Sequence, residues 1–182
     1  NKSTTIWIKD NNKKIIHYDV FTSPPNGEIN YEFAINERFS TGTYSVIMKQ
    51  DDVGDAAIFG VNQYPSPTII TLMDKTNFPL HSKAVLNILG PQSTKVTITV
   101  VDSNDNIKST DSVVTSSLGK NKVSVDLMGY DTGVYRAVAS TANIQDSVKF
   151  SVGLESGSGE ITLISTQSNY SLGNSILILG NT

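Results

Sequence analysis

Oxygen-bearing side chains follow one another in a short stretch of the sequence, Asp102-Ser103-Asn104-Asp105-Asn106. Oxygen donors in this alternating pattern resemble the start of a calcium loop, so Asp102, Asn104 and Asn106 are candidate calcium ligands. The closing Glu of such a loop is missing, and strand-like residues flank the stretch. Asp and Asn also favour tight turns for backbone reasons, so a plain hairpin is the alternative. Calcium is the only cofactor that the sequence suggests.

Other residues that could do chemistry are sparse. The chain has two histidines, His17 and His81, and no cysteine. Neither histidine has a second ligand at a metal-binding spacing, and no G-x-S-x-G elbow is present. The absence of Cys removes disulfides and thiolate chemistry. We therefore expect solvated or capping histidines and a protein that is not an enzyme.

A Gly followed two residues later by a Tyr occurs twice, as Gly42-x-Tyr44 and Gly133-x-Tyr135. A repeated pair indicates scaffold, whereas a ligand site would normally occur once. We expect each Gly to occupy a tight connection with positive φ. Each Tyr should begin an inner strand, with its ring in the core and its hydroxyl on loop backbone, as in a tyrosine corner. A ligand role for the two Tyr is the alternative.

Strands are expected to position these residues. Apolar and polar residues alternate along residues 96–100, 123–127 and 148–152, and turn residues recur about every 8–12 positions. This period of two is typical of half-buried strands in an all-β sandwich. Helical spacing is not sustained anywhere in the sequence, so the predicted class is all-β.

The chain contains an internal repeat. Ile8 aligns with Val100 at an offset of 92 positions, and Tyr44 aligns with Tyr135 at an offset of 91. A further pair of similar segments, ITLM and ITLI, begins at residues 70 and 161.

The repeat divides the chain into three predicted parts. Residues 1–65 should hold the last five strands of one Ig-like unit. Residues 66–155 should form a complete domain of seven strands. Residues 156–182 should hold the first two strands of a following unit and complete a neighbouring domain.

The openings of the units are similar to a pattern T-D-K-x-x-Y-x-x-G. It occurs as residues 73–81, with Phe78 for Tyr and His81 for Gly, and more closely as residues 165–173. This pattern and the Gly-x-Tyr pair resemble the immunoglobulin-like or macroglobulin-type β-sandwich repeats of prokaryotic surface proteins. Few Arg, many Asn, Ser and Thr, and no Cys make archaeal S-layer proteins the closest resemblance. It implies tandem antiparallel Ig-like sandwiches, about seven strands each, at the cell surface.

Composition narrows the classes of partner. Only 17% of residues are charged, the net charge is −3, and no basic cluster is present, so nucleic acid is not expected. Apolar stretches of about six residues are far short of the ~20 needed for a membrane span.

The sequence favours a structural segment of an extracellular protein that self-assembles into a lattice, stalk or filament. An adhesin that binds carbohydrate or protein through loops is the alternative, with Tyr18, Phe21 and Tyr64 as loop aromatics. A macroglobulin-type protease trap shares the fold but needs a bait region, and in many members a thioester Cys.

Trp7 lies between Ile6 and Ile8 in an alternating strand, so it points to the opposite face. We expect it to pack under a neighbouring loop or domain, with contact to a glycan or another subunit as the alternative. Asn1 and Asn169 begin glycosylation sequons, which permit an extracellular setting.

The first and last parts are complementary, because together they would rebuild one unit. We therefore expect copies of the chain to be partners, through head-to-tail or lattice contacts. The tail strands of one copy would pair with residues 1–62 of the next, or neighbouring repeats of a longer protein would supply them. A head-to-tail contact continues as a filament unless it closes into a ring.

Overall fold

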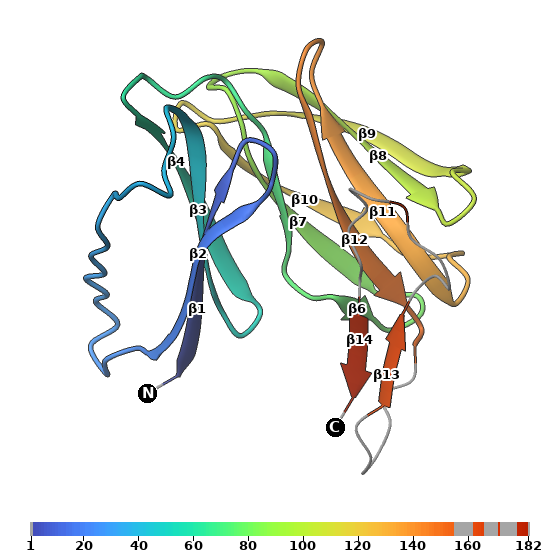
Figure 1. Cartoon of the computed structure of the whole chain (residues 1–182). Helices are drawn as coiled ribbons and strands as arrows, with labels where there is room; N and C mark the ends of the chain where they lie inside the picture. Colours follow the sequence, from blue (N-terminus) through green and yellow to red (C-terminus); the bar gives the residue numbers. More distant parts are fainter. Residues whose placement is uncertain (1, 155–161, 166–170, 172–177, 182) are drawn as a thin grey trace.

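The computed structural model describes residues 2–154, 162–165, 171 and 178–181. Over these residues the chain forms strands and loops and no helix (Figure 1), which confirms the predicted all-β class. None of these ranges holds a helix long and apolar enough to cross a bilayer. The strands are β1 (Ser3–Asp10), β2 (Ile15–Thr22), β3 (Gly42–Gln50), β4 (Val53–Val61), β5 (Ile70–Met73), β6 (Asn77–Phe78), β7 (Lys83–Leu89), β8 (Lys95–Asp102), β9 (Ile107–Val114), β10 (Lys120–Asp126), β11 (Gly133–Ser140), β12 (Gln145–Val152), β13 (Thr162–Ser165) and β14 (Ile178–Asn181).

Strands β5 to β12 form a two-layer sandwich, called here the central domain. One sheet has the order β10-β7-β5 and the other β6-β12-β11-β8-β9, and all neighbours are antiparallel except β6 and β12. The chain crosses between sheets from β7 to β8 and from β10 to β11, which gives the Ig-like Greek-key connectivity. The tandem Ig-like prediction is confirmed for this domain, with the short β6 as an eighth strand.

Alternating residues of both sheets fill the core of the central domain. On β8, the side chains of Val96, Ile98 and Val100 are buried, whereas Thr97 and Thr99 between them are only partly buried. Leu86 and Phe150 reach the same cluster from the two sheets. Successive side chains on a strand point to opposite faces, so the period of two places one face of each sheet inward.

Strands β1 to β4 form one sheet in the order β2-β1-β3-β4, called here, with residues 23–41, the N-terminal unit. The repeat holds in the strand register, because Ile8 faces Val46 and the aligned Val100 faces Ala137. A register shift also follows Ile8 and Val100 in the two copies. This sheet is therefore equivalent to β9-β8-β11-β12 of the central domain.

The described part of residues 1–65 holds four strands, so the prediction of five strands there is wrong. Residues 28–35 align with β10 in the central domain but form no strand. The ladder partner of β10 is β7, and no described strand takes the position of β7 beside residues 28–35. A strand needs a hydrogen-bonded neighbour, so the strand pattern alone does not produce one here.

The two strands expected in residues 156–182 correspond to β13 and β14, which pair with each other antiparallel. They form a two-stranded sheet of their own beside the end of the central domain (Figure 1). The limits of the three domains stay predictions.

The N-terminal unit packs on the outer face of the sheet β10-β7-β5. A small apolar cluster joins Ile47 and Ala56 to Ile70, with the half-buried Trp7, Ile58, Leu72 and Leu89 around it. The opposite face of the N-terminal sheet carries a second cluster containing Ile8 and Tyr44. That second face corresponds to the core face of the central domain and lies away from it (Figure 1).

Candidate interaction sites

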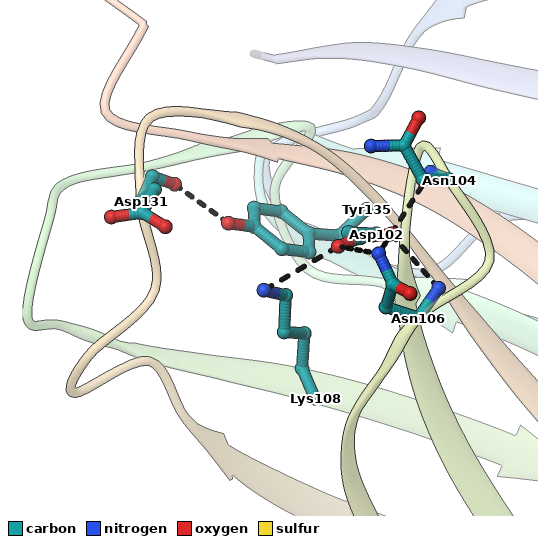
Figure 2. A network of polar contacts seen from close by, with 6 residues as sticks. All are labelled: Asp102, Asn104, Asn106, Lys108, Asp131 and Tyr135. Atoms are coloured by element: carbon teal, nitrogen blue, oxygen red, sulfur yellow. Dashed lines mark hydrogen bonds and ion pairs between the residues drawn. The ribbon is translucent and has the colours of Figure 1, made fainter.

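The candidate calcium loop is a β-hairpin turn between β8 and β9, closed by the carboxylate of Asp102 (Figure 2). Asp102 Oδ1 accepts the backbone N–H of Asn104 and of Asn106, both at 2.9 Å. The side-chain amide of Asn106 donates to Asp102 Oδ2 at 3.0 Å, and Lys108 Nζ lies 3.4 Å from the same oxygen. These donors hold the pKa of Asp102 down at about 2, the Asn106 amide contributing most.

This geometry has the features of the hairpin alternative. The Asp102 oxygens already accept several donors, and Lys108 would repel a cation there. In the other copy Asp10 Oδ1 accepts the N–H of Asn12 and Lys14 in the same way, both at 2.9 Å. Within the described ranges, no three His, Cys, Asp or Glu side chains are grouped as metal ligands.

The two tyrosines occupy equivalent buried positions. Tyr44 is 2% exposed and Tyr135 is 3% exposed. The Tyr44 hydroxyl donates to the carbonyl of Ser40 at 2.9 Å, and the Tyr135 hydroxyl donates to the carbonyl of Asp131 at 2.8 Å (Figure 2). Burial raises the pKa of the Tyr135 hydroxyl above its ordinary value. This is the geometry of a tyrosine corner.

The expectation of positive φ at Gly42 and Gly133 is wrong. Both residues begin strands, where they pair with Val61 and Val152 in extended conformation. Positive φ is instead found at other glycines, among them Gly119 in the turn before β10, with a φ of 76°. A Cβ there would also lie 2.3 Å from the carbonyl oxygen of Gly90.

The two histidines lie in different surroundings. His17 Nε2 is 2.6 Å from the Tyr31 hydroxyl, which donates to Asp19 at 2.9 Å. His81 is exposed and has a φ of 58°, at the position where the aligned repeat has Gly173. The structure brings neither histidine to another histidine.

Sequence reasoning missed an aromatic cluster on the open face of the N-terminal unit. Phe33 stacks on His17 with centroids 5.8 Å apart and on Phe39 at 6.0 Å, and Tyr31 stacks on Phe21 at 5.3 Å. The signal was present in the alternation of Tyr31 and Phe33, which align with the buried Val123 and Val125 of β10.

Trp7 lies at the contact between the two units, against the cluster of Ile47 and Ile70. Lys9 Nζ is 5.9 Å from the centre of its ring. Of the three aromatics expected in adhesin loops, only Tyr64 lies in a loop, where it is 95% exposed. Tyr18 and Phe21 lie in β2, so the expectation is wrong for them, although Tyr18 is 60% exposed. Asn1 and Asn169 lie outside the described residues.

Ion pairs also connect the two units. Lys13 of the N-terminal unit pairs with Asp146 of β12. In the reverse direction Lys120 lies 2.5 Å from Asp55, and Lys75 lies 3.5 Å from Asp52. Asp52 and Asp55 of the β3–β4 hairpin therefore face lysines of the central domain.

No known protein-family profile and no curated protein sequence matches the chain. Among solved structures, it is similar to a tetra-tandem repeat in the extending region of a large adhesion protein, at 19% identity and a TM-score of 0.40, covering 84% of this chain and 42% of that one. It is also similar to E. coli alpha-2-macroglobulin, at 12% identity and a TM-score of 0.44, with a match that covers 94% of this chain and 12% of that one. A third similar structure is the BSP domain of a biofilm-associated protein, at 18% identity and a TM-score of 0.32. The match covers 82% of this chain and 24% of that one. The chain spans less than half the length of each.

Proposed function

We propose that this chain is a structural, non-enzymatic segment of an extracellular surface protein, in which tandem Ig-like units serve as rigid spacers. The observation that carries the proposal is the contact between the units. Ile47 is 4% exposed and Ile70 is 7% exposed at this contact. An apolar contact restricts hinge motion more than a free linker does, so we expect adjacent units to act as one stiff body.

The setting is proposed from composition and from the resemblance of the repeat. Hydroxyl and amide side chains dominate the polar residues, and the chain has no Cys. Together with the opening pattern of residues 165–173, this favours a cell-surface lattice or stalk of the archaeal S-layer type. Tyr64, an exposed aromatic in a loop, favours the adhesin as the second candidate, and Tyr18 is an exposed aromatic on β2.

Antibodies raised against the chain test the extracellular setting. We expect them to label intact cells of the source organism, and we expect protease added outside to remove the label. Labelling only after the cells are permeabilised would contradict the proposal.

Self-association is part of the proposed function. In the central domain, β5 and β7 cover the face that is equivalent to the open aromatic face of the N-terminal unit. Ile35 of that unit is 50% exposed, whereas the aligned Leu127 is fully buried. We propose that the pair β13–β14 of one copy covers this face of another copy, with β14 beside residues 28–35.

Light scattering on the full chain and on a version that ends at Glu155 tests this contact. We expect the full chain to form larger species as its concentration rises and the shortened version to stay monomeric. Hydrogen exchange should show protection of residues 28–35 only in the full chain. Monomers in both cases, with residues 28–35 equally protected, would refute the proposed contact.

A further inference from the structure

A groove of about 830 Å³ lies between the N-terminal unit and the central domain. Residues of β1 and β3 line one side, and residues of β5 and β12 line the other. Its volume lies within the range of roughly 300–1,000 Å³ that is typical of ligand sites, which often form between domains. The contact between the units therefore creates a space that neither unit has alone.

Positive side chains dominate this groove, although the protein has a net charge of −3. Asp10 and Asp146 are its only lining carboxylates among the residues described. The lining cations are Lys9, Lys13, Lys49, Lys75, Arg136 and Lys149. A concave surface with one sign of charge attracts ligands of the opposite sign.

Both carboxylates in the groove are already engaged. Asp146 Oδ2 accepts the backbone N–H and the hydroxyl of Thr71, both at 2.7 Å, and Asp146 also pairs with Lys13. Asp10 accepts backbone N–H groups of its own turn. Asp146 also acts electrostatically on Lys9, but two carboxylates offset only part of the charge of the cations that line the groove, so a positive excess remains.

Lys9 is the cation that stands out. It is half-buried, and no ion pair to it is present in the described part of the chain. Burial lowers the pKa of Lys9. Its ammonium group lies near the ring of Trp7, at 5.9 Å from the centroid. A half-buried cation beside an indole offers an anion a charged partner and an apolar surface next to each other.

Two other cations can change partner. Lys75 pairs with Asp52, and Arg136 pairs with Asp105, and both carboxylates are exposed to solvent. Exposed ion pairs contribute little to stability, so a ligand carboxylate can replace these partners at small cost.

We propose that this groove binds an acidic oligosaccharide, with a uronate carboxylate at Lys9 and a sugar ring against Trp7. The ring of a sugar has apolar C–H faces that suit an indole, while its hydroxyls suit polar side chains. Ser45, Gln145 and Ser147 supply such polar groups along the groove. The proposal goes beyond the spacer function, which needs no ligand.

Fluorescence of Trp7, the only Trp in the chain, gives a direct test. The probes are an oligogalacturonate and an uncharged malto-oligosaccharide of the same length. We expect a saturable change with the acidic sugar, at least about tenfold tighter binding than with the neutral one, and weaker binding at high salt. Calorimetry with both sugars provides a second readout that does not depend on the indole.

Lys9→Gln removes the charge and shortens the side chain by one atom, while keeping a polar end. Loss of one charge-assisted contact should weaken binding of the oligogalacturonate about tenfold. Lys95→Gln is the matched control, because Lys95 is exposed at the start of β8 and does not line the groove. Circular dichroism would verify that both variants fold.

Several results would overturn the proposal. One is the absence of both heat and fluorescence change up to millimolar oligogalacturonate. Equal binding of the neutral sugar is another, and so is unchanged affinity in folded Lys9→Gln. The antibody and scattering experiments do not involve the groove, so the two proposals can fail separately.

Discussion

At the scale of single residues, Asp102 and Tyr135 are both candidates for a ligand site from the sequence, and in the structure both hydrogen-bond to the backbone of a turn or loop. The carboxylate of Asp102 binds the turn that follows its own strand. The hydroxyl of Tyr135 binds the loop that precedes its strand, at the carbonyl of Asp131. Each polar group thus fixes a connection next to the core (Figure 2).

The acidity of Asp102 is the first prediction. Carbon NMR should place the midpoint of its titration at a pH of about 2, below its ordinary value of 3.8. Because the pKa is lowered in the folded state, the stabilisation is complete above the unfolded pKa and is lost as the pH falls from about 4 towards 2. Asn106→Ala removes the strongest contributor and should raise the midpoint. A midpoint near 4 in the unchanged protein would contradict the closed turn.

Tyr135 supplies the second prediction. Tyr135→Ala should lower the free energy of unfolding by about 3–5 kcal/mol, because it deletes a large buried ring. Tyr135→Phe should cost only about 1 kcal/mol, since it removes the bond to Asp131 and keeps the packing. Denaturant unfolding measures both. A loss under about 1 kcal/mol for the Ala variant would return Tyr135 to the candidates for a ligand site.

At the scale of elements, short turns and unpaired segments decide where the regular strands end. His81 lies in the turn between β6 and β7, in the left-handed region with a φ of 58°. Residues 29–34 retain the alternating burial of a strand but have no backbone ladder in the described structure. His81 thus adopts a conformation that favours glycine, and residues 28–35 form no strand although their sequence alternates like one.

The turn at His81 gives the third prediction. His81→Gly should raise the free energy of unfolding by about 0.5–1 kcal/mol, because glycine adopts positive φ without the steric cost borne by other residues. His81→Ala is the control, since it removes the imidazole but retains a Cβ at positive φ. If the Ala variant is stabilised as much as the Gly variant, the imidazole and not the backbone is the cause.

At the scale of the whole molecule, the contact between the units decides whether a tandem array is stiff. The N-terminal sheet uses one face for this contact and presents its other, aromatic face away from the central domain. The groove with Lys9 and Trp7 lies at the same junction. Stiffness and the proposed ligand site therefore depend on one interface.

The fourth prediction concerns this interface. Ile47→Ala should loosen the junction, because Ile47 is 4% exposed and packs near Ile70. Nitrogen relaxation should show equal rotational correlation times for β3 and β11 in the unchanged protein and different times in the variant. Val53→Ala is the control, because Val53 is 74% exposed. Different times in the unchanged protein would contradict the rigid-spacer proposal.

The sequence by itself determined the strands and the repeat. A period of two identifies which residues face inward wherever one face is buried, and the aligned Ile8 and Val100 are both buried. The same alternation could not determine whether residues 28–35 become a strand, because pairing depends on a neighbour distant in the sequence. Tertiary structure alone decided the extended conformation at Gly42, the stacking around Phe33 and the groove at Lys9. Each of these depends on contacts between segments that are far apart along the chain.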